Sequence, residues 1–183
     1  MRKRVFIGCP IDSLKMVIHH FVCNHLTDPL CKIVPERNLH LTYYFAGMVE
    51  DDILPIIYYK IEQLSEQQEV IYLQSKSFTK IKKHKQGMFW LEFMGSEEFN
   101  RLALLSREAF NVTANPIPLH PECRPHITLA RFKDDANIHW QKDIDFTDAH
   151  LALTHINIYE SKSGTHHVEY SLLKSFPFKG GQA

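Results

Sequence analysis

Two short elements of the sequence pair a histidine with a threonine, a combination suited to proton transfer beside an anion. His40 and Thr42 form the first His-x-Thr element, and His126 and Thr128 form the second. Imidazole titrates near pH ~6.5, so one histidine can accept a proton while the other donates one. Cleavage of a phosphodiester needs such a pair, one to deprotonate the nucleophile and one to protonate the leaving oxygen on the opposite side of phosphorus. The threonine hydroxyls could then hold the non-bridging oxygens without a metal.

The tripeptide alone is a weak signal, and its surroundings decide between chance and function. The chain contains three matches to His-x-[Ser/Thr], all with Thr, whereas composition predicts about 1.2 by chance. We interpret the third, His25-Leu26-Thr27, as the chance match because it lies at a predicted helix end. The other two lie in short apolar strands, where residues i and i+2 project from the same face. Two such pairs in related halves of the chain can face each other across a groove. The alternative is that both histidines are buried core residues whose ring nitrogens have hydrogen-bond partners within the protein.

The elements that would position these pairs alternate along the chain. Apolar and β-branched runs predict strands, and apolar residues at helical spacing predict helices, with Pro55 tolerated in a first turn and Ser96 as an N-cap. Gly47 is expected to end the second strand. Because several strand pairs are close enough to form hairpins, we expect an α+β fold with mixed or antiparallel sheets. The predicted strands are residues 3–9, 39–46, 70–81, 88–93, 127–130, 151–159 and 168–173, and the predicted helices are residues 12–25, 51–65 and 96–110.

Composition argues against several other classes of protein. The chain has 183 residues, and its 21 basic and 21 acidic residues cancel to no net charge, which argues against coating of nucleic acid by bulk charge. The four cysteines form no CxxC pair, and His19-His20 and His166-His167 have no companions at metal-site spacing. No apolar run approaches the roughly 20 residues of a membrane helix. We therefore predict a cytoplasmic protein with no metal, no cofactor, no membrane contact and no evident obligate protein partner.

The flanks of the two elements resemble a known family. Asn38-Leu39-His40-Leu41-Thr42, followed by Phe45 and Gly47, and Arg124-Pro125-His126-Ile127-Thr128-Leu129-Ala130-Arg131 are similar to the paired signatures of the two-histidine phosphoesterase superfamily. More narrowly, they resemble its LigT/ThpR branch, the RNA 2′,3′-cyclic phosphodiesterases historically called 2′-5′ RNA ligases. The resemblance implies a single bilobal domain over residues 1–183 with pseudo-twofold symmetry. Two related sheets would line a central cleft that holds residues 40–42 and 126–128, with the helices outside.

The resemblance also implies a reaction. This is the metal-independent hydrolysis of the terminal 2′,3′-cyclic phosphate of RNA to a 2′-phosphomonoester, with RNA ends or nucleotides bearing a cyclic phosphate as partners. By that analogy His126 is the general base that activates water and His40 is the general acid that protonates the departing O3′. Thr42 and Thr128 would bind phosphate oxygens. The sequence is nearly symmetric about the two elements, so the acid and base roles rest on the resemblance alone.

The fifth residue after each histidine differs between the two elements. It is Phe45 in the first and Arg131 in the second. A regular strand places this residue on the face opposite the histidine, so it reaches the cleft only where the strand ends or bulges. There Arg131 would bind phosphate through its guanidinium and Phe45 would stack on a base; the alternatives are a surface arginine and a core phenylalanine. Tyr44, two positions after Thr42, is a further candidate for base stacking in the cleft.

Other residues near these elements are weaker signals. A basic cluster in a predicted turn is either solvated or attracts an RNA strand. Trp90 is predicted to be a core residue. Before the second element, His120, Glu122 and Arg124 are explained by loop polarity or by substrate contact. The basic cluster consists of Lys80, Lys82, Lys83, His84 and Lys85.

Two other classes of function compete with the leading hypothesis. Within the same family, the substrate could be a 2′-5′ oligonucleotide or a small cyclic nucleotide, with 2′-5′ ligation of RNA as a minor activity. Outside catalysis, the chain could be an RNA- or nucleotide-binding module that keeps the fold. The presence of both histidines and both threonines argues against the second alternative, because binding alone does not need two opposed proton carriers.

Overall fold

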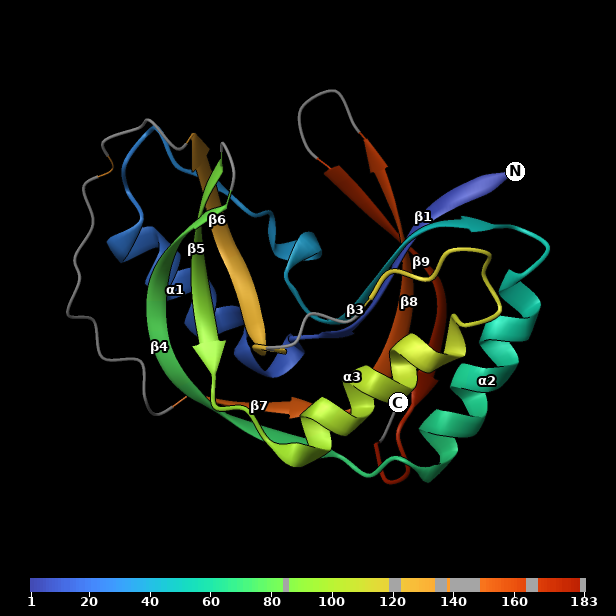
Figure 1. Cartoon of the computed structure of the whole chain (residues 1–183). Helices are drawn as coiled ribbons and strands as arrows, with labels where there is room; N and C mark the ends of the chain where they lie inside the picture. Colours follow the sequence, from blue (N-terminus) through green and yellow to red (C-terminus); the bar gives the residue numbers. More distant parts are fainter. Residues whose placement is uncertain (84–85, 119–122, 134–137, 139–148, 164–167, 182–183) are drawn as a thin grey trace.

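The computed structural model describes residues 1–83, 86–118, 123–133, 138, 149–163 and 168–181 (Figure 1). Within this part of the chain, nine strands form one curled sheet whose strand pairs are all antiparallel. This confirms the predicted α+β class. The strands are β1 (Arg2–Pro10), β2 (Lys32–Ile33), β3 (His40–Glu50), β4 (Ile71–Lys83), β5 (Gln86–Phe93), β6 (His126–Lys133), β7 (His150–Leu153), β8 (His155–Ser163) and β9 (Val168–Pro177).

The two lobes predicted from the sequence are halves of this one sheet. The strand order is β7-β4-β5-β6-β3-β1-β8-β9. The short strand β2 lies off this path and pairs with β6 on the edge opposite β5. The first four strands form one half and the last four form the other, and each half contributes one His-x-Thr element. The two halves meet between β3 and β6, where the register consists of the single pair Leu41↔Ile127. The cleft therefore lies within one sheet that is nearly divided, rather than between two separate sheets.

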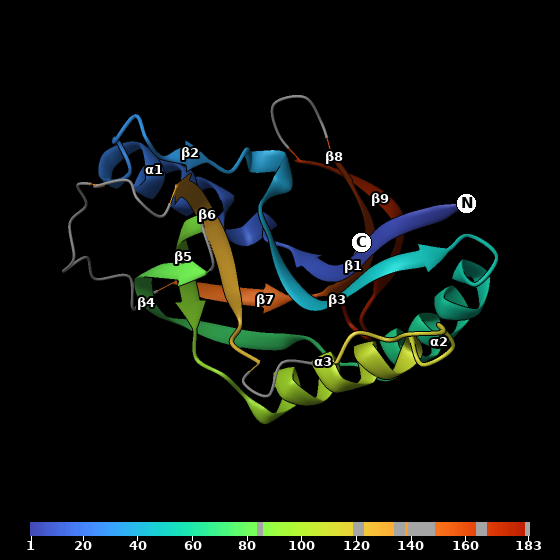
Figure 2. The ribbon, with the colours of Figure 1, turned by 45° about the horizontal axis from the view of Figure 1, so that its top comes forward.

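The helices lie on the outer face of the sheet, as expected (Figures 1 and 2). A 3-10 turn η1 (Asp12–Leu14) leads into α1 (Lys15–His25), which packs against β4 through Phe21 and Phe78, 4.8 Å apart between ring centroids. The helices α2 (Leu54–Gln67) and α3 (Glu97–Ala109) cover the other half. The N-cap prediction for Ser96 is confirmed, since its hydroxyl accepts a hydrogen bond from the Phe99 N–H at 3.1 Å. Among the described residues, every helix is too short or too polar to span a bilayer.

β-bulges occur at the same place in both His-x-Thr strands. In β3, Tyr43 is the extra residue opposite the Ile7-Gly8 step of β1, so Tyr43 and Tyr44 are both buried. In β6, Leu129 is the extra residue opposite the Phe89-Trp90 step of β5, so Leu129 and the next residue are both buried. A bulge resets the alternation of side chains along a strand. The fifth residue after each histidine is thereby returned to the face that carries the histidine.

Several predicted strand boundaries are wrong: β6 continues to Lys133 and β9 to Pro177, and two further differences have a clear structural reason. The strand predicted from residue 39 does not end at Gly47. A second bulge at Ala46 accommodates the positive φ of 74° at Gly47, so β3 continues to Glu50. The single strand predicted at residues 151–159 is two strands separated by Thr154. Of these, β7 pairs with β4 and β8 pairs with β1, so the chain crosses from one half of the sheet to the other at this point.

Close approach of β1 to β3 beside the first His-x-Thr element requires a glycine. A Cβ added to Gly8 would lie 2.4 Å from the Leu41 carbonyl oxygen, which is a backbone atom that cannot turn aside. We expect Gly8→Ala to lower the free energy of unfolding by about 1–3 kcal/mol, because β1 must shift away from β3. Urea denaturation measures this change. Gly95→Ala is the matched control, since its Cβ would meet no atom within 4 Å; equal effects of the two substitutions would contradict the prediction.

Candidate active site

The register between β3 and β6 brings the two His-x-Thr elements together. Leu41 and Ile127 are fully buried and point to the outer face. Continuing this antiparallel pair by one residue in each direction places His40 opposite Thr128 and Thr42 opposite His126, all on the other face. Each histidine thus has one threonine beside it on its own strand and the second across from it. Neither the Thr42 nor the Thr128 hydroxyl forms a hydrogen bond with another described residue.

Both histidines are oriented by the same backbone contact. His40 Nδ1 lies 2.7 Å from the carbonyl oxygen of Asn38, and His126 Nδ1 lies 2.8 Å from that of Arg124. A carbonyl oxygen only accepts hydrogen bonds, so Nδ1 carries the proton in both rings and donates it. In the neutral ring, Nε2 is then the free base. Asn38 is buried and is itself held by a 2.7 Å hydrogen bond from its side-chain amide to the Val168 carbonyl.

His40 is enclosed by aromatic rings. Phe6 lies 4.7 Å from the imidazole between ring centroids, and Tyr170 meets it edge-on at 5.0 Å. Burial lowers the pKa of His40 to about 4, although the Asn38 carbonyl opposes this, and the nearby charges of His126 and Arg131 lower it further. His40 is therefore neutral at pH 7 in the free protein.

His126 has a more polar setting. Trp90 stacks on it with ring centroids 3.7 Å apart and an interplanar angle of 18°. Glu92, its cross-strand partner in β5, is buried and accepts hydrogen bonds from Thr79 at 3.0 Å and from Ser77 at 3.4 Å. Burial lowers the pKa of His126; the Arg124 carbonyl and the Glu92 carboxylate raise it, and the charges of Arg124 and Arg131 lower it. A carboxylate thus supports the imidazolium form of His126, whereas none acts on His40.

Arg124 connects these groups. Its Nη1 lies 3.0 Å from Glu92 Oε1, and the two groups form an ion pair whose geometry does not meet that of a hydrogen bond. Its guanidinium carbon lies 5.4 Å from the Trp90 ring centroid. The prediction that Trp90 is a core residue is wrong, because Trp90 and Glu92 share the face of β5 that carries the site. His120 and Glu122, which precede Arg124 in the chain, lie outside the described residues.

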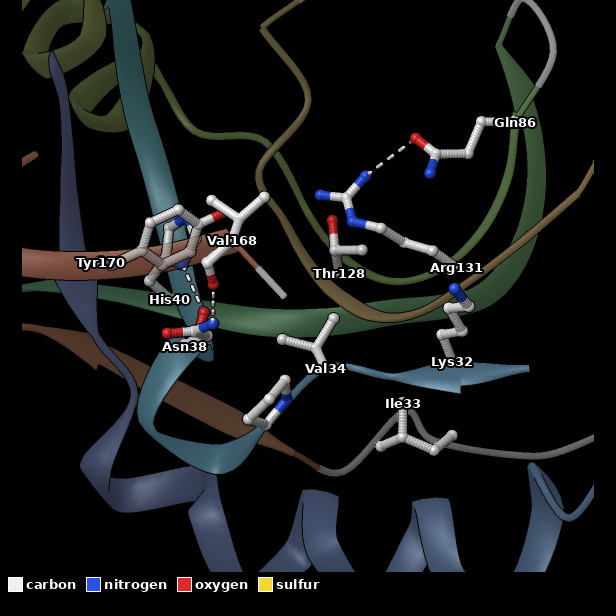
Figure 3. A pocket seen from close by; sticks show the side chains of 11 residues that line it. Lys32, Ile33, Val34, Asn38, His40, Gln86, Thr128, Arg131, Val168 and Tyr170 are labelled. Carbon is white, nitrogen blue, oxygen red and sulfur yellow. Dashed lines mark hydrogen bonds between the residues drawn. The ribbon is translucent and has the colours of Figure 1, made fainter. Parts of the chain in front are cut away.

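A cavity of about 190 Å³ adjoins the two elements (Figure 3). Three of the predicted site residues, His40, Thr128 and Arg131, line it; Thr42 and His126 lie beside it on the same face. Arg131 Nη1 lies 3.1 Å from Met88 Sδ and 3.4 Å from Gln86 Oε1, which orient the guanidinium across the cavity. The remaining lining residues are Lys32, Ile33, Val34, Pro35, Asn38, Gln86, Val168 and Tyr170.

The two aromatic candidates of β3 have different positions. Phe45 is 38% exposed on the site face and pairs in register with Phe6, the residue that contacts His40; the Arg4 guanidinium lies 5.1 Å from its ring. Tyr44 was predicted to face the cleft, and this is wrong. It is buried on the outer face, where its hydroxyl donates a 2.6 Å hydrogen bond to the Ile117 carbonyl. The bulge at Tyr43 is the reason, because it shifts Tyr44 to the face opposite Thr42.

Sequence reasoning missed Trp90, Glu92 and Tyr170 as parts of this site. Alternation along residues 88–93 would have put Trp90 and Glu92 on one face, but only pairing with β6 shows which face that is. No three His, Cys, Asp or Glu side chains among the described residues gather as metal ligands. His84, Lys85, His166 and His167 lie outside the described part of the chain.

Comparisons with known proteins agree with this architecture. No protein-family model matches the chain. A curated Thermotoga maritima protein, RNA 2′,3′-cyclic phosphodiesterase, is 31% identical over 160 residues, which cover 81% of this chain and 80% of the relative.

Solved structures extend the likeness to the fold. Escherichia coli LigT in its apo form has a TM-score of 0.74 at 21% identity, covering 97% of this chain and 98% of LigT. LigT complexed with 3′-AMP has a TM-score of 0.72 at 20% identity, covering 97% and 99%. The Thermus thermophilus protein TT0787 has a TM-score of 0.79 at 18% identity, covering 96% and 97%. The identity to the Thermotoga enzyme confirms the predicted enzyme class: the chain belongs to the family of RNA 2′,3′-cyclic phosphodiesterases.

Proposed function

We propose that this protein hydrolyses the terminal 2′,3′-cyclic phosphate of RNA to a 2′-phosphomonoester, without a metal, by acid–base catalysis from His40 and His126. The observation that supports this most directly is the matched orientation of the two imidazoles. Each donates Nδ1–H to a backbone carbonyl, which leaves both Nε2 atoms free on one face of the sheet. We take residues 1–183 as one catalytic domain, because each half of the sheet supplies one histidine. Its cytoplasmic location stays a prediction.

The proposed reaction balances with these two proton carriers. His126 Nε2 takes a proton from water, the water oxygen bonds to phosphorus, and the bond from phosphorus to O3′ breaks. His40, protonated at Nε2, gives its proton to O3′, so the product carries a 2′-phosphate and a free 3′-hydroxyl. Thr42, Thr128 and Arg131 would bind the non-bridging oxygens, whose negative charge they offset.

The electrostatic asymmetry of the site favours these roles. Glu92 stabilises the imidazolium that forms when His126 takes a proton, which makes His126 the better base. His40 has no such carboxylate, and its pKa of about 4 makes it a strong acid once it is charged. The anionic phosphate would supply the missing stabilisation, since a negative charge beside a buried imidazole raises its pKa. The protonated state of His40 would therefore form with the substrate bound.

We expect purified protein to hydrolyse a short RNA with a 2′,3′-cyclic phosphate end in the presence of EDTA. His40→Ala and His126→Ala should each lower the rate by about 10²–10⁴-fold, the usual contribution of a positioned proton carrier. The terminal phosphate of the product is identified by mass spectrometry and phosphatase mapping. His25→Ala, at the chance His-x-Thr match on α1, is the control and should keep full activity.

Three results would count against the proposal. These are turnover that survives both substitutions, a strict need for added metal, and a 3′-phosphate product, which would mean that O2′ leaves instead. Parallel reactions with 2′-5′ and 3′-5′ dinucleotides and with nucleoside 2′,3′-cyclic phosphates separate the alternative substrates.

The Glu92 carboxylate should control the titration of His126 but not that of His40. Glu92→Gln removes the charge that raises the pKa of His126, so this pKa should fall further below its ordinary value of about 6.5. The pKa of His40 should not move. NMR titration of the two imidazoles measures both changes, and the rising limb of the pH dependence of kcat/KM should move to lower pH if His126 is the base. Equal shifts at both histidines would indicate a general structural change instead.

A further inference from the structure

The cavity beside the histidines has a second positively charged end. Lys32 of β2 is the register partner of Arg131 in β6, so the two side chains lie next to each other across this edge pairing. In Figure 3, Asn38, His40 and Tyr170 lie at one end of the cavity, Lys32 and Gln86 lie at the other, and Thr128 and Arg131 lie between them. Lys32 thus lies on the same edge of β6 as β3, beside Arg131 and at the end of the cavity away from His40.

Within the described part of the chain, the Lys32 side chain is exposed and its ammonium forms no ion pair. Among the described residues, no carboxylate forms an ion pair with either Lys32 or Arg131. Among the described residues, Lys3, Lys15 and Lys162 do form ion pairs, with Asp51, Asp12 and Glu160. Two adjacent cations at the wall of a cavity, with no counter-charge on any residue that the structure describes, favour an anionic ligand.

One phosphate group does not account for both ends. The groups assigned above to the reacting phosphate, Thr42, Thr128 and Arg131, lie around the histidines, and Lys32 lies outside that set. The wall also includes the apolar side chains of Ile33, Val34 and Val168, which suit a ribose or the face of a base. A ligand that spans the cavity therefore carries an anion, an organic part and a second anion.

We propose that Lys32 binds the phosphate on the 5′ side of the terminal nucleotide, so that the cavity holds the end of an RNA strand rather than a bare nucleoside cyclic phosphate. This rests on the proposed function, because the first anion is the cyclic phosphate at the histidines. An RNA strand carries one phosphate per nucleotide, so the next anion follows directly after the terminal ribose. A nucleoside 2′,3′-cyclic phosphate lacks it.

Lys80, one of the hairpin lysines singled out from the sequence, does not serve this role equally well. The Lys80 ammonium lies 5.0 Å from the ring centroid of Phe132, a buried residue on the outer face of the sheet. That face is opposite the one that carries Thr128 and Arg131. Lys32 is on the site face and at the cavity wall, which is why the inference concerns Lys32.

A pair of substrates that differ only in the 5′-phosphate tests the proposal. Adenosine 2′,3′-cyclic phosphate is compared with its 5′-phosphorylated form, using the wild-type protein, Lys32→Gln and Lys60→Gln. Lys60 is exposed on α2, so its substitution removes the same charge far from the cavity. We expect Lys32→Gln to lower kcat/KM for the 5′-phosphorylated substrate by about 5- to 10-fold and to change the other by less than about twofold. Lys60→Gln should change neither.

Salt dependence gives a second readout. For a short RNA that ends in a 2′,3′-cyclic phosphate, the slope of log(kcat/KM) against log salt concentration should become shallower by about 0.7 in Lys32→Gln, the value for one lost contact to a single-strand phosphate. Equal losses on both adenosine substrates would overturn the proposal and place Lys32 at the reacting phosphate. Loss on neither substrate would overturn it as well.

Binding of products separates this proposal from the proposed function. Adenosine 2′,5′-bisphosphate and adenosine 2′-phosphate are titrated calorimetrically into the wild-type protein and Lys32→Gln. The proposal requires that the 5′-phosphate raises affinity in the wild type and that Lys32→Gln removes this gain; absence of the gain overturns it even if hydrolysis occurs. A folded wild-type protein that shows the binding gain but hydrolyses neither cyclic phosphate would contradict the proposed function alone.

Discussion

The backbone pairing between Leu41 and Ile127 joins the two halves of the sheet, and the candidate site depends on it. It is the single register pair between β3 and β6. Because both side chains are buried on the outer face, the residues on either side of each must point the other way. One pair therefore places two histidines and two threonines on one face. Divergence of the strands on both sides of this pair leaves room for a cavity that a continuous ladder would close.

The matching bulges are the second constraint, and they distinguish this site from two ordinary amphipathic strands. A regular strand would bury Arg131 and Phe45 on the outer face, where a guanidinium without a partner would carry a large desolvation penalty. The extra residues Tyr43 and Leu129 each fill the outer face with a second apolar side chain and return the following residue to the site face. The same local irregularity thus improves the packing of the core and brings Arg131 to the cavity wall.

The symmetry of backbone geometry does not extend to the surroundings of the two histidines. Both rings are held by a carbonyl two residues earlier, yet His40 contacts aromatic side chains while His126 lies beside Glu92 and under Trp90. In a partly buried site, such differences decide which imidazole gains a proton more readily. The buried Glu92 in turn accepts hydrogen bonds from Ser77 and Thr79 and forms an ion pair with Arg124. Two similar His-x-Thr elements can therefore hold histidines that differ in how readily they accept a proton.

The sequence by itself determined the local features: the α+β class, the Ser96 N-cap, the strands around both elements and the family to which the chain belongs. These follow from periodicity, capping and motif residues that act over a few positions. It did not determine which side chains share the site. Tyr44 was misplaced because one extra residue reverses the alternation, and Trp90 and Glu92 were missed because their neighbour His126 is on another strand. Only the tertiary structure decided the register of β3, β5 and β6, since pairing between strands distant in sequence depends on packing of the whole sheet rather than on any local pattern.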